Sequence, residues 1–203
     1  MKVLITGGCG FIGHHLVDHI LKNTDWEVVI FDKLSYAANG FDRLREIGAN
    51  WPRVTTFPID LNMPVSDGVL KETGEVDYIF HLAADSHVDN SIADPRGFIF
   101  NNVHSTVNIL EFARTQKKLK MFVNFSSDEV YGTAPKGVSF KEREFHFPSN
   151  PYSASKSSQE AIGIAYSNTY NVPVISIHCM NAFGERQHAE KYVPLVVNKL
   201  LND

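Results

Sequence analysis

The sequence predicts an α/β fold built on a doubly wound parallel sheet. Short apolar, β-branched segments alternate with helical patterns along the chain, a glycine-rich turn follows the first such segment, and an aspartate ends the second. Alternating strands and helices are typical of parallel sheets, because parallel strands need a crossover connection. We expect the strand order 3-2-1-4-5-6 of such sheets. All 203 residues are expected to form one domain.

The composition is that of an ordinary soluble globular protein. Hydrophobic residues make up 43% and charged residues 21% of the chain, and the net charge is −4. Because there is no basic block and no apolar run of membrane-spanning length, we expect neither a nucleic-acid partner nor membrane contact. The first residues lack the apolar core of a signal peptide, and Cys9 and Cys179 do not suggest a disulfide framework. We therefore expect a cytoplasmic location.

The first strand is predicted at residues 2–6, and a glycine-rich turn follows it directly. Gly7, Gly10 and Gly13 would permit a tight turn, close approach of the backbone to a pyrophosphate, and close packing of the next helix on the strand. The N-terminus of that helix would offer unpaired N–H groups and a positive dipole to the phosphates. The turn lies between a strand and a helix, as a dinucleotide-binding loop requires.

The second strand is predicted at residues 27–31 and ends at Asp32. A carboxylate at this position could accept hydrogen bonds from the ribose hydroxyls of an adenosine and would repel a 2′-phosphate. The pattern therefore favours NAD over NADP. The alternative is a strand-end aspartate that only begins a turn.

Two groups of histidines could be read as metal ligands, and we expect no metal site in either. His15 and His19 have the i,i+4 spacing of metal ligands on the first helix, which also carries His14. No glutamate lies between them in the arrangement of zinc proteases, and no third metal ligand is suggested by the sequence nearby. A solvated helix face is therefore expected. His81 and His87 are expected to be a buried strand-end histidine and a loop donor.

Two more strands end in residues that suit a ligand. The third strand, at 53–59, is followed by Asp60, whose carboxylate could meet an adenine amino group. The fourth strand, at 76–81, is followed by small residues typical of close packing against a bound cofactor. Ser86 and His87 would then point into the crevice as substrate contacts.

The other elements follow from apolar periodicity and loop composition. They are a loop at 71–75, a helix at about 95–117, a strand at 121–125, a loop at 132–151, a helix at 152–170, a strand at 174–178 and a helix at 192–201. Two of these helices carry apolar residues beyond one face, at Ile99, Val103, Val107, Leu110, Ala161, Ile162, Ile164 and Ala165. This second stripe, with Gly163 permitting close approach, predicts a homodimer. The alternative is a stripe wholly covered by the chain's own sheet.

Asp128 and Glu129 are adjacent carboxylates at the predicted mouth of a buried sheet. Ionised groups at such a place need partners or a purpose. Two neighbouring carboxyl groups can divide the roles of acid and base between them. The alternative is a solvated acidic turn.

Tyr152 and Lys156 are four residues apart, so on a helix they lie one turn apart on the same face. An ammonium about 4–5 Å from the phenol, at an effective dielectric of about 20, contributes roughly 3–4 kcal/mol. This is about 2–3 pKa units, which would bring the tyrosine pKa near neutrality. Such a tyrosine can take the proton of a substrate hydroxyl. The same spacing arises by chance in many helices. The glycine turn and Asp32 are therefore needed as supporting evidence that the pair is catalytic.

Four segments together resemble the extended short-chain dehydrogenase/reductase family, and within it the nucleotide-sugar 4,6-dehydratases. They are Thr-Gly-Gly-Cys-Gly-Phe-Ile-Gly at 6–13, Phe-Asp-Lys-Leu-Ser-Tyr-Ala at 31–37, His-Leu-Ala-Ala-Asp-Ser-His-Val-Asp at 81–89 and Ser-Ser-Asp-Glu-Val-Tyr-Gly at 126–132. The last segment discriminates best, because epimerases and decarboxylases of this fold generally lack the Asp-Glu pair. This chain departs from the family at Cys9, Ser127, Ala182 and Glu185, where alanine, threonine, asparagine and proline are usual.

The resemblance implies a Rossmann domain over residues 1–203, with about 180–203 beginning the substrate-binding region and the C-terminal substrate lobe truncated or absent. It implies catalytic roles for Ser127, Asp128, Glu129, Tyr152 and Lys156, and substrate contacts from Ser86, His87, Ser127, Asn181 and Lys191. The residues expected to bind NAD are Gly7, Gly10, Phe11, Ile12, Gly13, Asp32, Lys33, Leu34, Ser35, Asp60, Leu61, Leu82, Ala83, Ala84, Ser86, Asn101, Ser126, Tyr152 and Lys156.

The reaction that the resemblance implies converts a nucleotide-activated glucose into its 4-keto-6-deoxy form with tightly bound NAD. Tyr152, assisted by Lys156, would take the 4-hydroxyl proton, Glu129 the C5 proton, and Asp128 would protonate the departing 6-hydroxyl. Ser127 would orient the 4-hydroxyl, and Lys191 could approach the diphosphate. Two alternatives remain: a 4-epimerase or decarboxylase of the same fold, and a non-catalytic NAD-binding protein without the substrate lobe.

Overall fold

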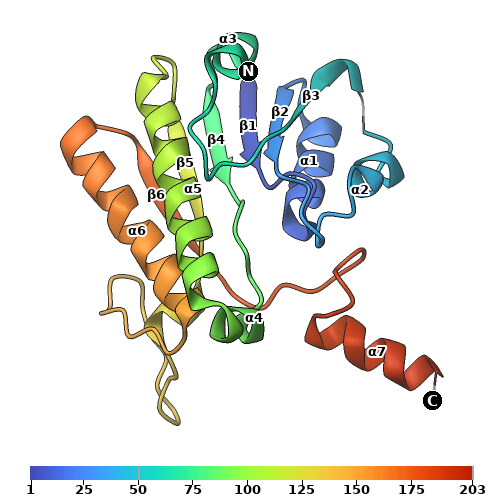
Figure 1. The fold of residues 1–203 in the computed structure, drawn as a ribbon, viewed down its shortest axis with the longest axis vertical. Helices are drawn as coiled ribbons and strands as arrows, with labels where there is room; N and C mark the ends of the chain where they lie inside the picture. Colours follow the sequence, from blue (N-terminus) through green and yellow to red (C-terminus); the bar gives the residue numbers. More distant parts are fainter. Residues whose placement is uncertain (50, 203) are drawn as a thin grey trace.

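A computed structural model describes residues 1–49 and 51–202 of the chain. In this described part, six parallel strands form one sheet in the order β3-β2-β1-β4-β5-β6, which confirms the predicted order (Figure 1). The strands are β1 (Lys2–Thr6), β2 (Glu27–Asp32), β3 (Val54–Pro58), β4 (Tyr78–His81), β5 (Met121–Ser127) and β6 (Val174–Cys179). The order reverses between β1 and β4, which both flank the centre of the sheet. The fold class predicted from the sequence is therefore confirmed.

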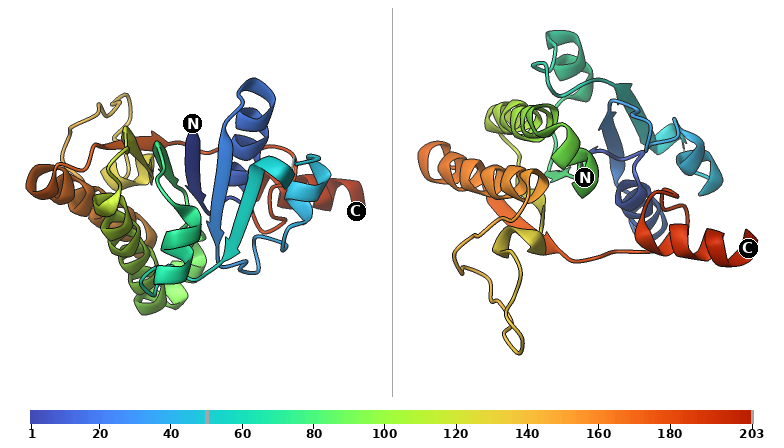
Figure 2. Two further views of the ribbon diagram at one scale, coloured as in Figure 1. Left: turned by 90° about the horizontal axis from the view of Figure 1, so that it is seen from above. Right: turned by 60° about the horizontal axis from the view of Figure 1, so that its bottom comes forward.

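Helices cover both faces of the sheet. They are α1 (Phe11–Asn23), α2 (Asp42–Glu46), α3 (Asp67–Thr73), α4 (Val88–Ala93), α5 (Pro95–Thr115), α6 (Pro151–Tyr170) and α7 (Tyr192–Asn202), with short 3₁₀ turns at Trp51–Arg53 and Asp128–Tyr131. Figure 2 shows α1 on one side of the sheet and α5 and α6 on the other. The sheet therefore has an apolar core on each face.

Successive side chains of β1 point to opposite faces of the sheet and so contribute to both apolar cores. Leu4 packs into the cluster beneath α5, whereas Val3 and Ile5 pack into the cluster beneath α1. All three side chains are fully buried, which agrees with the near-continuous apolar sequence of the strand. The carboxyl ends of the strands then meet at one edge of the sheet, on the side of α4 and α7 (Figure 1).

Three short helices escaped prediction because each is too short for apolar periodicity to reveal it. The region 71–75, expected as a loop, is partly helical, since α3 extends to Thr73. Ser66 caps this helix by accepting a hydrogen bond from Val69 N, and Gly74 ends it with a φ of 66°. The helices α2 and α4 were likewise unexpected.

The prediction that the α1 histidines lie on a solvated face is wrong for His14. Its side chain is fully buried, and Nδ1 lies 3.0 Å from Gly10 O. Burial lowers the pKa of His14 below its usual value. Position 14 lies one turn before Val17, which packs on the sheet, so His14 shares the buried stripe. His19 is exposed, as predicted.

The second apolar stripe on α5 and α6 is smaller than predicted. Leu110 is fully buried in the chain's own core, and a Cβ on Gly163 would lie 3.1 Å from Val174 Cγ1, so Gly163 serves packing on β6. Ile99 and Ile164 do project outward, at 43% and 61% exposure.

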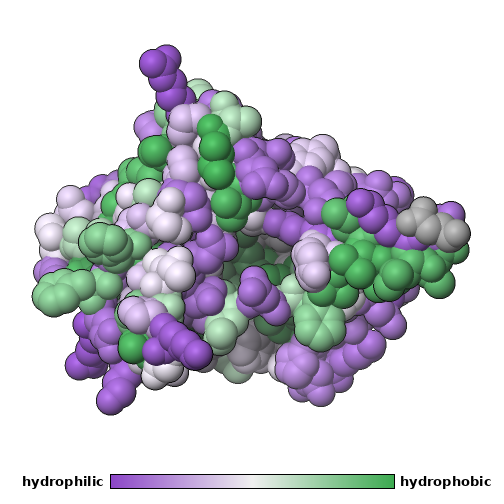
Figure 3. All heavy atoms as spheres, turned by 90° about the horizontal axis from the view of Figure 1, so that it is seen from below, coloured by the Kyte–Doolittle hydropathy of each residue, from purple (hydrophilic) through white to green (hydrophobic). Residues whose placement is uncertain are grey.

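The helix α7 carries a further exposed apolar surface, visible at the right of Figure 3. Its exposed side chains are Tyr192, Val193, Leu195, Val197, Leu200 and Leu201. Within residues 1–49 and 51–202, none of the helices combines the length and the apolar character needed to cross a membrane.

His81 is buried at the end of β4, as predicted, and joins three elements. Its Nδ1 lies 2.7 Å from Thr6 Oγ1, and its Nε2 lies 3.0 Å from Thr106 Oγ1. Burial and, to a smaller extent, the charge of Lys156 together lower the pKa of His81 to about 3. In the unfolded chain a histidine pKa is about 6.5. Between the two pKa values the histidine is protonated in the unfolded chain but neutral in the folded protein. The free energy of unfolding therefore decreases as the pH falls from about 6.5 towards about 3.

We predict that His81 makes the protein about 2 kcal/mol less stable at about pH 5 than at about pH 7. Urea unfolding of the wild type and of His81→Gln at both pH values measures this, because the substitution removes the titrating ring. The loss of stability on acidification should shrink by about 2 kcal/mol in His81→Gln and remain unchanged in His19→Gln. Equal pH dependence in all three proteins would contradict the prediction.

Candidate active site

A cavity of about 660 Å³ opens at the carboxyl ends of the strands. Viewed from that side, the molecule is hollowed near its centre, between the bulk of the protein and α7 (Figure 3). The cavity lies where the strand order reverses, which is the usual ligand site of open α/β sheets. It is lined by residues from both halves of the sheet, from the glycine turn and from the region after β6.

The glycine turn has no room for side chains at two positions. Gly7 has a φ of +72°, and a Cβ there would lie 2.9 Å from Ala83 N. A Cβ on Gly13 would overlap Gly7 O. The turn therefore packs directly on the segment after β4 and on the start of α1, which leaves backbone exposed to the cavity.

Asp32 is held rigidly at the end of β2. Its Oδ2 accepts a hydrogen bond of 2.9 Å from Cys9 N, and its Oδ1 accepts one of 2.8 Å from Leu34 N. Burial raises the pKa of this carboxyl, while the two backbone N–H groups oppose the shift. The carboxylate lines the cavity in a fixed orientation, as a hydroxyl acceptor should.

All but one of the residues predicted to bind a cofactor line this cavity. The exception is Leu34, which packs against the core beneath α1 and reaches the site only through its N–H bond to Asp32. Lys33 is fixed at the same edge, since its Nζ donates to Asn101 Oδ1 at 2.7 Å and lies 3.5 Å from Asp85 Oδ1.

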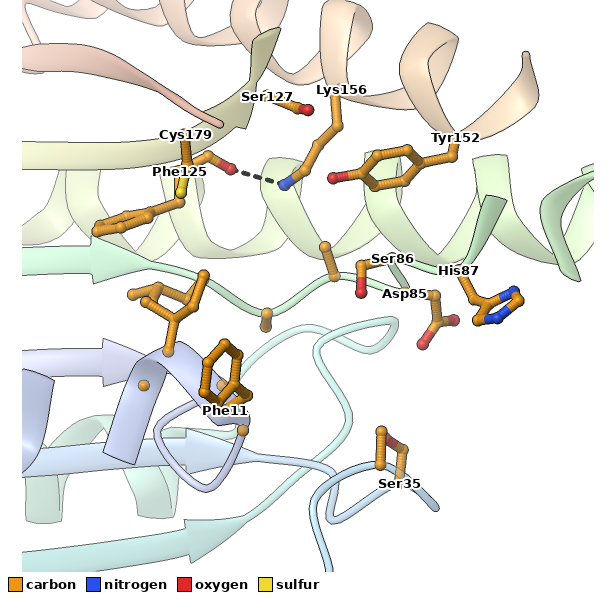
Figure 4. A pocket seen from close by; sticks show the side chains of 18 of the residues that line it. Phe11, Ser35, Asp85, Ser86, His87, Phe125, Ser127, Tyr152, Lys156 and Cys179 are labelled. Atoms are coloured by element: carbon orange, nitrogen blue, oxygen red, sulfur yellow. Dashed lines mark hydrogen bonds between the residues drawn. The ribbon is translucent and has the colours of Figure 1, made fainter. Parts of the chain in front are cut away.

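Tyr152 and Lys156 project from the first turns of α6 into the cavity, near Ser127 (Figure 4). Both are buried, at 8% and 5% exposure. Lys156 Nζ donates a 2.6 Å hydrogen bond to Phe125 O at the end of β5. Burial lowers the pKa of Lys156 to about 8, against a raising effect of the Glu160 carboxylate.

The expected lowering of the Tyr152 pKa is wrong for this structure. Burial raises that pKa to about 12; a hydrogen bond with Ser127 lowers it, and the nearby Glu129 charge raises it. The Lys156 ammonium is directed at Phe125 O, so its attraction does not offset the loss of solvation of a phenolate. The four-residue spacing correctly predicted that Tyr152 and Lys156 lie close together on one helix, but it did not predict that the Tyr152 pKa is raised.

The two adjacent carboxylates also face the cavity, in the 3₁₀ turn after β5. Ser127 Oγ accepts a hydrogen bond of 3.3 Å from Glu129 N and lies 3.4 Å from Asp128 Oδ1. Glu129 Oε2 accepts a 3.1 Å hydrogen bond from Asn150 Nδ2. The end of β5 and the start of α6 therefore line the same cavity.

The predicted substrate contacts other than Ser127 come from the loop after β4 and from the segment between β6 and α7. Ser86, His87, Asn181 and Lys191 all line the cavity. Lys191 Nζ donates to Ser86 O at 2.8 Å, so the segment before α7 is tied to the loop after β4. His87 has a local role as well, because its ring nitrogen caps α4 by accepting from Asn90 N.

Sequence reasoning missed the polar side chains that hold these segments in place. Asn102 exchanges hydrogen bonds with the Asp85 backbone at 2.8 and 3.0 Å and donates to Ser155 Oγ at 2.9 Å. A buried asparagine inside a helix is an unfavourable choice for helix formation, and this was the available signal. Arg43 donates to the backbone oxygens of Cys9, Ala37 and Ala38, and the sequence offered no signal for these contacts.

The fold and site define an extended short-chain dehydrogenase/reductase. The chain belongs to the family described as GDP-mannose 4,6 dehydratase, whose family model matches residues 4–202.

Proteins similar to this chain include sugar-nucleotide dehydratases and epimerases. It is 39% identical to a dTDP-glucose 4,6-dehydratase of Escherichia coli, over 97% of this chain and 59% of that protein. The corresponding enzyme of Haemophilus influenzae is 38% identical over 98% of this chain and 61% of that protein. The chain therefore spans about three fifths of the length of these relatives.

Solved structures resemble the fold closely. The dTDP-glucose 4,6-dehydratase DesIV of Streptomyces venezuelae, with NAD bound, superposes with a TM-score of 0.90 at 38% identity, over 100% of this chain and 62% of that one. A UDP-N-acetylglucosamine 4-epimerase of Methanobrevibacter ruminantium superposes with a TM-score of 0.86 at 30% identity, over 99% of this chain and 63% of that one.

We predict that Asn150 has two separable roles, as the N-cap of α6 and as a partner of Glu129. Asn150 Oδ1 accepts from Ser153 N at 2.9 Å, while its Nδ2 donates to Glu129. Asn150→Ala should lower the free energy of unfolding by about 1 kcal/mol. Asn150→Ser should restore most of this stability, because serine also caps helices, but it cannot restore the Glu129 contact. Urea unfolding compares the three proteins, and equal losses in both variants would contradict a capping role.

Proposed function

We propose that this protein is a nucleotide-sugar 4,6-dehydratase of the dTDP-glucose type that acts with bound NAD. Residues 1–203 are proposed as its dinucleotide-binding domain, with about 180–203 beginning the substrate-binding region. The observation that carries this proposal is the meeting of Asp128 and Glu129 with Tyr152 and Lys156 around one cavity. A cytoplasmic location is proposed with it, because Cys9 and Cys179 are free thiols.

The residues of the cavity fit NAD. The close packing at Gly7 and Gly13 leaves backbone for a pyrophosphate to approach, and the fixed Asp32 carboxylate suits ribose hydroxyls. When bound, NAD supplies an acceptor for the hydride of sugar C4 and returns that hydride to C6.

Tyr152 is proposed to remove the proton of the 4-hydroxyl. With a pKa raised to about 12 by burial, its phenol holds its own proton at neutral pH and needs nearby positive charge to release it. Lys156, one turn along α6, is a cation on the same helix that also lines the cavity. Ser127, whose hydrogen bond lowers the Tyr152 pKa, is proposed to orient the substrate hydroxyl.

The carboxylates are proposed to carry out the elimination. Glu129, positioned by Asn150, would take the proton from C5, which the neighbouring ketone has acidified. Asp128, beside Ser127, would protonate the departing 6-hydroxyl. Two carboxyl groups side by side can divide base and acid in this way.

A 4-epimerase is the second candidate, favoured by the similarity of the fold to the epimerase of Methanobrevibacter ruminantium. An epimerase needs the tyrosine and the cofactor site but has no elimination for a carboxylate pair to catalyse. The Asp128–Glu129 pair therefore favours dehydration over epimerisation.

We predict that the protein converts dTDP-glucose into a 4-keto-6-deoxy product and that Asp128→Asn slows this by about 10²–10⁴-fold. The variant lacks the acid for the leaving hydroxyl but keeps Tyr152, so it should accumulate the 4-keto-glucose nucleotide. Mass spectrometry follows the loss of oxygen from C6, with Tyr152→Phe as a control that should not oxidise C4 at all. A C4 epimer that retains its oxygen would identify an epimerase instead, and bound NAD without any product would indicate a non-catalytic protein.

The cofactor preference depends on the Asp32 charge. We predict that NAD binds at least about tenfold more tightly than NADP. Asp32→Asn should bring the two affinities closer together, because it removes the repulsion of a 2′-phosphate while keeping an oxygen acceptor. Calorimetric titration of both cofactors measures the ratio. Equal affinities for the wild type would refute the assignment of Asp32.

A homodimer is proposed to form through α5 and α6, which lie side by side on one face of the sheet (Figure 1). Ile99 and Ile164 are large apolar side chains exposed on these helices, and burying them requires a partner surface. We predict a dimer by light scattering at micromolar concentration and a monomer after Ile99→Glu with Ile164→Glu. A monomeric wild type would contradict the proposal, and the paired substitution Lys117→Glu with Lys118→Glu serves as the charge control.

A further inference from the structure

Three polar side chains from distant parts of the chain converge at a place that the proposed reaction does not use. His146 belongs to the segment before α6, Glu160 lies on α6, and His178 lies in β6. One ligand atom from each residue lies within 4.8 Å of the ligand atoms of the other two. None of the three lines the active-site cavity as the structure describes it.

Glu160 is a nearly buried carboxylate with one oxygen turned towards two imidazoles. It is 5% exposed, and an ionised group at such burial is costly unless it is paired. The Ser126 hydroxyl donates to Oε1, which leaves Oε2 facing the two imidazoles. His178 Nε2 lies 3.0 Å and His146 Nε2 3.8 Å from this oxygen. Lys156, one turn earlier on α6, donates to Phe125 O rather than to Glu160.

The surrounding hydrogen bonds suit a metal ion. His146 Nδ1 lies 2.8 Å from Ser157 Oγ, and an imidazole that donates from Nδ1 has its Nε2 lone pair free to ligate. His178 Nε2 is approached by both Glu160 Oε2 and the Tyr131 hydroxyl, the latter at 3.3 Å. A single ring nitrogen offers either one proton or one lone pair, so His178 Nε2 cannot donate a full hydrogen bond to Glu160 while accepting one from Tyr131. A cation between the imidazoles and the carboxylate would instead accept the lone pairs of both imidazoles and of Glu160 Oε2.

The spacing is close to that of a tetrahedral site. Zinc bonds of about 2.0–2.2 Å to nitrogen and oxygen place neighbouring ligand atoms about 3.3–3.5 Å apart. Glu160 Oε2 lies 3.0 Å from His178 Nε2 and 3.8 Å from His146 Nε2, so these two separations lie on either side of this value. Two imidazoles with one carboxylate favour zinc or a similar transition metal over magnesium or calcium, which prefer oxygen ligands.

We propose that His146, Glu160 and His178 bind one divalent transition-metal ion of the zinc class, with water in the fourth position. The ion would fasten the segment between Gly132 and Asn150 onto α6 and β6. Asn150 caps α6 and contacts Glu129, and it follows His146 by only four residues. Metal binding would therefore order the segment that positions a proposed catalytic carboxylate. No metal site was expected from the sequence, because its ligands come from three separate elements.

The test uses Co²⁺ and Zn²⁺ on the purified protein after removal of metal with a chelator. We expect one Co²⁺ per chain with the visible absorption of a tetrahedral site, displaced by Zn²⁺. His146→Ala and His178→Ala should each weaken binding at least about 100-fold, since even outer partners of metal ligands contribute about 10–100-fold. His19→Ala is the matched control, because His19 is an exposed histidine with the i,i+4 partner His15, and it should bind as the wild type does.

A second measurement is independent of the absorption. Zinc should slow hydrogen exchange of residues 133–150 in the wild type and in His19→Ala, but not in His146→Ala, and circular dichroism establishes that each variant is folded. His146 is on an irregular surface segment, so its truncation should leave the fold intact. The proposal is overturned if the wild type binds no Co²⁺, or if it binds Co²⁺ no more tightly than the two ligand variants. In that case the direct contacts of His178 Nε2 with Glu160 and with the Tyr131 hydroxyl account for the cluster.

Discussion

The burial of the Lys156 ammonium is the constraint on which much of this structure depends. At 5% exposure the ammonium needs an acceptor, and Phe125 O at the end of β5 provides one at 2.6 Å. This bond fastens α6 to the carboxyl edge of the sheet and so places Tyr152 beside Ser127 and the acidic turn. Burial lowers the Lys156 pKa to about 8, yet the Glu160 carboxylate acts against that shift and helps to keep the charge. The position of Tyr152 and the charge of Lys156 therefore depend on the same set of contacts.

The helix α6 serves two sites because of its periodicity. Tyr152, Lys156 and Glu160 follow one another at intervals of four residues, so they lie along one side of the helix. The first two reach the cavity, while the third meets His146 and His178. The Ser126 hydroxyl, which lines the cavity, also bonds to Glu160 and connects the two places. The acidic turn is linked to the same region through Asn150.

Much of the fold could be predicted because its signals are local. Six apolar strands, the glycine turn and Asp32 are each visible within a few residues, and the rules for parallel sheets then order the strands. The sites at the carboxyl edge follow, since residues just after parallel strands must meet there. His14 was misplaced because a single side chain on a helix can face either way, and only packing selects the direction. The supporting bonds of Asn102 and Arg43 join elements far apart in the sequence, so no local pattern reveals them.

By itself, the sequence determined the order of the elements, the glycine turn and the spacing of Tyr152 and Lys156, because periodicity and backbone freedom are properties of neighbouring residues. Only the tertiary structure decided how those groups titrate. The four-residue spacing suggested a lowered Tyr152 pKa, whereas burial, which depends on everything packed around the phenol, raises it to about 12. The meeting of His146, Glu160 and His178 was likewise decided by the packing of α6 on β6. Solvation and long-range contact depend on the whole folded chain, and these determine the charges of the site.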